Sequence, residues 1–300
     1  WSAIRDALDL GDASTPGVRA ALNDDASLRD LSTRSVIGRS VEEMHQSFGW
    51  SAADLDWEVY GQAGDGAAMV ARFDDSISLS DVRGTLRTLG YKQDGPVWNS
   101  TSSSPITGEL AATLASLAIV PGKRLVVAAG RETYVRTVLQ VIDRDDPSLL
   151  TVRSAADVAK ALTGTDAALL QSGPVACDAT SLKKLPADVQ AQADAAIARA
   201  GDLAEVDFAG RGIVDTSTNQ QEVRFAMGFD SPSQAAAQLM ARRALASGPL
   251  IGGNGRIEDS LQLAGSRIEG STASLRFDHD PASSAYMTGA GPLLFASCPD

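Results

Sequence analysis

The sequence is poor in aromatic residues, in basic residues, and in the cysteine and histidine that often bind metals or act as nucleophile and base. Aromatic side chains make up 5% of its 300 residues, and it contains only two cysteines and two histidines. Its 26 basic residues are outnumbered by 38 acidic ones, and no basic block offsets the net charge of −12. Without clustered lysine and arginine, nucleic acid and anionic membrane surfaces are poor candidate partners.

The sequence also has no apolar run long enough to cross a bilayer. Its longest apolar stretch, residues 117–130, is interrupted by Pro121-Gly122-Lys123-Arg124, and a spanning helix needs about 20 apolar residues. What is present is 44% hydrophobic and 21% charged residues, which is the composition of a soluble globular chain. At about 150 residues for each domain, the length favours two structural units.

The hydrophobic periodicity predicts helices and antiparallel strands in both units. We expect a helical and loop segment over 1–50, a first α+β unit over 51–146 and a second over 147–300. Ser231-Pro232-Ser233-Gln234 is typical of a capped helix start. The predicted helices are 41–48, 79–89, 132–143, 155–162, 187–200 and 232–247; the predicted strands are 56–60, 67–73, 95–99, 117–120, 124–130, 166–173, 204–215, 221–229, 261–269 and 274–277.

The two units share an order of elements: a hairpin, then Phe-Asp, then an amphipathic helix, then strands. Phe73-Asp74 precedes the first such helix and Phe229-Asp230 the second. The order of the second half is that of a ferredoxin-like split βαβ unit, so we predict a duplicated α+β fold of this type. The alternative is coincidence, because hairpin–helix units recur in many α+β chains.

The two cysteines, Cys177 and Cys298, lie far apart, and neither has a second cysteine or a histidine at metal-ligand spacing. Cys298 lies in a Pro-flanked tail that would fray unless it were tethered. We therefore predict a Cys177–Cys298 disulfide, which would stabilise the fold by about 4 kcal/mol. Two buried thiols and one reactive thiol are the alternatives. A disulfide indicates export, since the cytosol keeps thiols reduced.

Candidate catalytic and metal-binding residues are few. His45 is expected on the exposed side of its helix, and Asp278-His279-Asp280 is expected in a solvated loop rather than around a divalent cation. Ser181-Leu182-Lys183-Lys184 fits the Ser-x-x-Lys pattern of penicillin-recognising serine enzymes, and Ser217-Thr218-Asn219 loosely resembles their second element. The third element, Lys-Thr-Gly, is missing. We predict no catalytic, cofactor-binding or metal-binding residue.

Two tryptophans and one glycosylation sequon bear on possible binding surfaces. Trp57 alternates with Val59, which predicts that it packs into the core. Trp98 lies beside a Ser-rich loop, where core packing and a ligand groove are the alternatives. Asn99-Ser100-Thr101 matches the sequon for N-glycosylation.

Taken together, the Ala- and Arg-rich composition, the non-Met start, the paired α+β units and the single predicted disulfide resemble the uncharacterised exported or lipid-anchored proteins of actinobacteria. That resemblance implies an extracytoplasmic protein, secreted or anchored to the outer face of the membrane. We predict a non-enzymatic binding or assembly module without a cofactor, whose partner is an envelope protein or a small apolar or polymeric ligand. The alternative is a serine or carboxylate hydrolase of the cell envelope. A calcium-supported adhesion domain at Asp278 and Asp280 is a third hypothesis.

Overall fold

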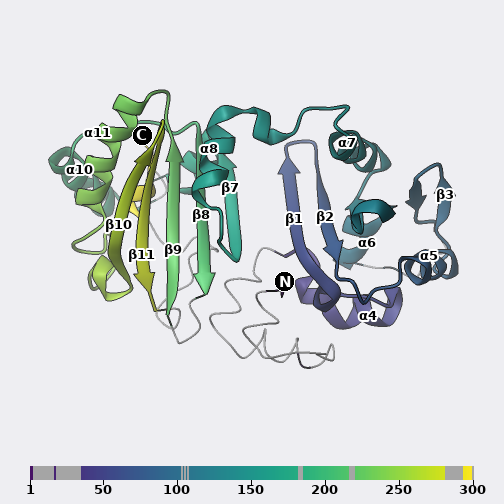
Figure 1. Cartoon of the computed structure of the whole chain (residues 1–300). Helices are drawn as coiled ribbons and strands as arrows, with labels where there is room; N and C mark the ends of the chain where they lie inside the picture. The colour runs from purple at the N-terminus through teal and green to yellow at the C-terminus, as the bar shows by residue number, and fades with distance from the viewer. Residues whose placement is uncertain are drawn as a thin grey trace. The chain divides into compact units, whose positions relative to one another are not determined.

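The computed structural model describes residues 1–2, 17, 35–102, 104, 106, 108–181, 185–215, 220–280 and 293–298. The chain divides into two compact units, Trp1–Ser148 and Leu149–Asp300, with the border two residues after the one predicted at Asp146. Each unit combines helices with an antiparallel sheet, which confirms the α+β class (Figure 1). Of the predicted segment 1–50, residues 3–16 and 18–34 lie outside the described residues.

The first unit is built on a six-stranded sheet in which every neighbouring pair is antiparallel. The strand order is β1-β2-β6-β5-β4-β3, so β1 and β3 are the edges. Its strands are β1 (Leu55–Ala63), β2 (Gly66–Phe73), β3 (Lys92–Asp94), β4 (Val97–Asn99), β5 (Ser116–Val120) and β6 (Leu125–Ala129), and its helices are α4 (Val41–Phe48), α5 (Leu79–Thr88), α6 (Gly108–Leu114) and α7 (Glu132–Asp143).

One face of this sheet is covered by α7. Val97, Ala118 and Val127 lie opposite one another on neighbouring strands and therefore share a face. They pack with Val135 of α7 in a cluster that is at most 2% exposed. The other face receives Phe73, whose ring lies 5.0 Å from that of Trp50, so the chain that follows α4 closes this side.

The second unit is built on a five-stranded antiparallel sheet with the order β10-β11-β9-β8-β7. The side chain of Ser231 caps α11 by accepting a hydrogen bond from the main-chain N–H of Gln234, which confirms the predicted helix start. The strands are β7 (Ala167–Ser172), β8 (Phe208–Asp215), β9 (Gln221–Gly228), β10 (Leu261–Glu269) and β11 (Thr272–His279), and the helices are α8 (Arg153–Ala161), α9 (Gly173–Ala179), α10 (Ala187–Ala200) and α11 (Pro232–Leu245).

Glycines let α8 approach one face of this second sheet closely. A Cβ atom on Gly210 would lie 2.6 Å from Leu162 Cδ1 and 2.9 Å from Val158 Cγ1, closer than carbon atoms can pack. Leu162 and Val158 form a buried cluster with Ala226 of β9. The small residues of these strands therefore allow α8 to pack closely against the sheet.

The strand order does not match the ferredoxin-like prediction for the second half. In a split βαβ unit the first strand lies inside the sheet, whereas β7 lies at an edge and pairs only with β8. The two units do share one feature of strand pairing. In the first unit β2, the second strand of the β1–β2 hairpin, pairs with β6, the second strand of the β5–β6 hairpin. In the second unit β9, the second strand of the β8–β9 hairpin, pairs with β11, the second strand of the β10–β11 hairpin. The connections between these hairpins differ, and this pairing does not establish a duplication.

Candidate functional site

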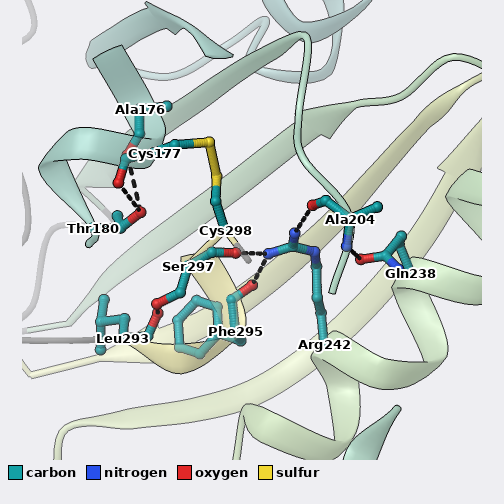
Figure 2. Close-up of a disulfide and its surroundings, with 10 residues drawn as sticks. All are labelled: Ala176, Cys177, Thr180, Ala204, Gln238, Arg242, Leu293, Phe295, Ser297 and Cys298. Carbon is teal, nitrogen blue, oxygen red and sulfur yellow. Dashed lines mark hydrogen bonds between the residues drawn. A yellow bond between two sulfur atoms is a disulfide. The ribbon is translucent and has the colours of Figure 1, made fainter. Parts of the chain in front are cut away.

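The two cysteines form a disulfide in the second unit (Figure 2). Cys177 follows the predicted strand 166–173 and lies in α9, a short helix that the sequence analysis did not predict, and Cys298 follows the 3-10 turn Leu294–Ala296. The sulfur atoms are 1.95 Å apart and the Cα atoms 5.1 Å apart, across 121 residues of sequence. A closed loop of that length implies a stabilisation of about 5 kcal/mol if chain entropy dominates. The predicted pairing is thus present.

Arg242 of α11 provides a second attachment for residues 293–298, which we call the 293–298 segment. Its Nη1 donates hydrogen bonds to the carbonyl oxygens of Phe295, at 2.8 Å, and Ser297, at 2.9 Å. Its Nη2 donates to the carbonyl oxygen of Ala204 at 3.0 Å. Figure 2 shows the guanidinium between these two stretches of chain. One side chain therefore joins α11 to two segments that are far from it in sequence.

Arg242 is a buried cation. Its side chain is 0% exposed, and within the described part of the chain it has no carboxylate in ion-pair range. Burial lowers its pKa to about 10, so the guanidinium keeps its proton at neutral pH. Carbonyl oxygens and the face of Phe229, whose centroid lies 5.6 Å from Cζ, replace the missing counter-charge.

Gln238 lies one helical turn before Arg242 and on the same face of α11. Its Oε1 accepts from the main-chain N–H of Ala204 and its Nε2 donates to the carbonyl oxygen of Asp202, each at 2.9 Å. The Gln238 amide therefore both accepts from and donates to the main chain of one loop, residues 202–204. Gln238 and Arg242 together fix the segment that leads into β8.

Phe295 anchors the 293–298 segment in the core. Its ring is 0% exposed, stacks on Phe277 with centroids 4.9 Å apart, and meets the edge of Phe225 at 5.0 Å. The disulfide, the Arg242 hydrogen bonds and this aromatic contact therefore hold the same six residues. The arrangement is structural: it consists of carbonyl oxygens, a disulfide and phenyl rings, and both terminal nitrogens of Arg242 donate hydrogen bonds within it, while its Nε is buried without a partner among the described residues.

The predicted histidines fall in different environments. His45 is exposed on α4, as predicted. His279 is the last residue of β11 and only 2% exposed, with Nδ1 3.0 Å from the carbonyl oxygen of Ser260, so the expected solvated loop is wrong at this residue. The strand extends further than the sequence indicated and carries His279 into the core. Among the described residues no three His, Cys, Asp or Glu side chains gather as a metal site.

The Ser-x-x-Lys pattern falls largely outside the described residues. Ser181 follows α9, whereas Lys183, Lys184 and the Ser217-Thr218-Asn219 stretch are not described. The hydrolase hypothesis through Ser181 and Lys184 therefore stays a prediction.

Trp98 is a core residue and does not line a groove. It is 4% exposed, and the guanidinium of Arg87 lies 5.1 Å above its ring. The neighbouring Asn99 is also engaged, because its amide donates to Glu132 at 2.6 Å and its carbonyl oxygen accepts from the Ser116 hydroxyl at 2.7 Å. A folded chain does not offer that amide for glycosylation.

Trp57 is the clearest departure from the sequence analysis. It lies on the edge strand β1 and is 39% exposed, beside Val59 at 58% and Tyr60 at 42%. The alternating pattern identified its face correctly, since Val59 pairs with Val70 of the α7 face. However, α7 packs over β2, β4, β5 and β6, and Trp57 and Val59 of β1 remain open to solvent. Burial on this face depends on strand order, which the local pattern does not contain.

We call residues 57–63 of β1, with the outer side of their main chain, the β1 edge. The acidic residues near it are engaged: Asp56 is 2.6 Å from the guanidinium of Arg72, and the carboxylate of Glu58 accepts from the Trp1 indole at 3.0 Å and the Val36 N–H at 2.8 Å. Residues 59–63 carry no charge. Apart from Glu58, the β1 edge is therefore uncharged, and it is largely exposed and free of the lysine or proline that commonly protects an edge strand.

No helix of the described ranges is both long and apolar enough to cross a membrane. Comparison with family models, curated proteins and solved structures found no match to this chain.

Proposed function

We propose that this chain is an extracytoplasmic protein of the cell envelope that acts as a binding or assembly module rather than as an enzyme, with the β1 edge as its contact surface. The observation that carries the proposal is the exposure of Trp57, Val59 and Tyr60 on an edge strand. Tryptophan and tyrosine are enriched among the few residues that supply most of the binding energy at protein interfaces. Among the described strands none pairs with the outer side of β1, and such an edge adds a row of main-chain donors and acceptors.

The disulfide supports the proposed compartment. A bond between Cys177 and Cys298 persists where thiols are not kept reduced, as outside the cytoplasm. This agrees with the exported or lipid-anchored type that the sequence resembles. The 293–298 segment, held in three ways, then serves to keep the second unit folded in that environment.

Site-specific photo-crosslinking in the cell that naturally makes the chain tests the proposed contact surface. A photoreactive amino acid is placed at Val59, and in a matched control at Met240, which is 76% exposed on α11. We expect a discrete covalent adduct from position 59 and none from position 240. The absence of an adduct at 59, or equal adducts at both positions, would overturn the proposal. Thiol alkylation in the same cells should leave Cys177 and Cys298 unmodified until a reductant is added.

A further inference from the structure

The hairpin register determines which main-chain groups of β1 face outward. Ala63 pairs with Gly66 across the two-residue turn Gly64-Asp65, so these two residues form a hydrogen-bonded pair. Hydrogen-bonded and non-hydrogen-bonded pairs alternate along an antiparallel ladder. Val59 and Gly61 therefore direct their main-chain groups toward β2. The N–H and C=O groups of Glu58, Tyr60 and Gln62 point toward the free side.

The side chains of the β1 edge alternate between the two faces of the sheet. Glu58, Tyr60 and Gln62 lie on the face that also carries Met69 and Ala71, their partners on β2. On the other face the side chains become smaller along the strand, from Trp57 through Val59 to Gly61 and Ala63. One end of the strand is thus bulky and the other end small.

Because the side chains are large at one end of the strand and small at the other, the β1 edge is complementary to a second β1 edge that runs antiparallel to it. With Tyr60 opposite Tyr60 of a second copy, Trp57 lies opposite Ala63 and Val59 opposite Gly61, so that large residues meet small ones. Glu58 then lies opposite the amide of Gln62, and no like charges face each other. Cross-strand pairs of these kinds, with an aromatic pair at the centre, stabilise a sheet.

Neighbouring registers make fewer hydrogen bonds. The register centred on Tyr60 joins all the outward residues, Tyr60 to Tyr60 and Glu58 to Gln62 twice, with two hydrogen bonds for each pair. Moving the centre to Val59 would pair Gln62 with Asp56, whose carbonyl oxygen already accepts from the Trp1 amino group at 3.0 Å. Moving it toward Gly61 would pair Glu58 with the turn residue Gly64.

We propose that the partner of the β1 edge is a second copy of this chain, joined by antiparallel β1–β1 pairing about a two-fold axis at Tyr60. The inference rests on the proposed function and names the partner of its contact surface. The two six-stranded sheets become one continuous sheet, and the free edge is consumed, so the assembly closes as a dimer.

Charge exchange at the two-fold axis tests this register. Position 60 faces itself across the axis, so Tyr60→Lys and Tyr60→Glu each place like charges together, whereas a mixture of the two variants places opposite charges together. By sedimentation equilibrium of the whole disulfide-bonded chain we expect the wild type to be dimeric and each variant to be monomeric. The dimer dissociation constant of each variant should be at least about tenfold higher than that of the wild type. The 1:1 mixture should form mixed dimers. Met240→Lys and Met240→Glu are the matched controls and should stay dimeric.

A second variant separates pairing from folding. Gln62→Pro removes an outward N–H and leaves the N–H groups of β1 that bond to β2 intact, which edge strands tolerate. We expect native tryptophan fluorescence and a weakened dimer. A wild type that remains monomeric at several hundred micromolar, or single Tyr60 variants that remain dimeric, would overturn the inference. So would a mixture that fails to form dimers.

The crosslinking experiment distinguishes failure of this inference from failure of the proposed function. An adduct at Val59 with twice the mass of the uncrosslinked protein from the same cells supports self-pairing. An adduct of any other mass overturns self-pairing and leaves the binding module intact. No adduct overturns both.

Discussion

A guanidinium nitrogen of Arg242 donates a 2.8 Å hydrogen bond to the main-chain carbonyl oxygen of Phe295, 53 residues further along the chain. The same nitrogen also donates to the carbonyl oxygen of Ser297, and the second terminal nitrogen donates to that of Ala204. Arg242 thus satisfies three carbonyl oxygens at the place where the 293–298 segment, α11 and the approach to β8 meet. The second unit depends on this cation for its closure.

Replacing Arg242 should destabilise the second unit selectively. Arg242→Met retains the volume but leaves three carbonyl oxygens without their donor, and we expect a loss of about 3 kcal/mol in the free energy of unfolding. All four tryptophans lie in the first unit. Urea unfolding followed by far-UV circular dichroism should therefore show the loss, while the tryptophan fluorescence transition stays in place.

Arg243→Met is the matched control for that variant. Arg243 is the next residue of α11 and is exposed, so its replacement should change stability by less than about 0.5 kcal/mol. Equal losses in the two variants would contradict the role assigned to Arg242.

The disulfide and Arg242 should be coupled, because both hold the 293–298 segment. Replacing both cysteines by alanine should lower the free energy of unfolding by about 5 kcal/mol in the chain-entropy account. Without the bridge the segment is freer to leave α11, so Arg242→Met should cost less in this background than in the disulfide-bonded chain. A double-mutant cycle by urea unfolding measures the difference. Strict additivity would show that the two attachments act independently.

The sheet surface under α8 should not tolerate an added methyl group. Gly210→Ala places a Cβ atom within 2.6 Å of Leu162 and 2.9 Å of Val158, and we expect a loss of about 2 kcal/mol through overpacking. Gly84→Ala in α5 is the opposite case, since a Cβ there meets nothing within 4 Å. It should stabilise the first unit by about 0.5 kcal/mol through helix propensity. Thermal unfolding of both variants checks the signs, and a neutral Gly210→Ala would contradict the close packing.

The Glu132 carboxylate should give the first unit part of its sensitivity to acid. Hydrogen bonds from Arg136 and Asn99 hold the pKa of Glu132 below its usual value of 4.5. A carboxylate with a lowered pKa stabilises the fold above the unfolded value, and that stabilisation is lost as the pH falls through the folded value. Glu132→Gln should therefore make the decline of stability below about pH 4.5 shallower.

Urea midpoints by tryptophan fluorescence at pH 6 and pH 3.5 measure that change. Glu43→Gln, at an exposed carboxylate of α4, serves as the control. An unchanged acid dependence in Glu132→Gln would show that the contact has no energetic consequence.

Local chemistry predicted much of this fold. The Ser231 cap, the amphipathic helices, the hairpins and the disulfide all follow from short patterns or from cysteine count. The short strand β3 (Lys92–Asp94) and the helix α6 (Gly108–Leu114) were missed, because three exposed polar residues and seven residues beside a Ser-rich loop carry little periodicity.

The features that bear on function were the least predictable. Arg242 lies in a pair of arginines on an Ala-rich helix, and the sequence analysis did not separate the buried arginine from the exposed one. A signal was available in Gln238 and Arg242, which share a face with Ala235 and Leu239 at helical spacing. Trp57 was expected in the core, since alternation assigns a residue to a face but does not say whether a helix covers it. Strand order decides this, and strand order is a long-range property.

Residue-resolved amide hydrogen exchange of β1 tests the central claim, that the outer side of this strand pairs with a second copy of the chain, most directly. The N–H groups of Val59 and Gly61 bond to β2 and should be protected at every concentration. The N–H groups of Tyr60 and Gln62 should exchange fast in dilute protein and become protected as concentration rises and the second copy binds. If Tyr60 and Gln62 exchange equally fast across the whole range, the β1–β1 pairing is contradicted.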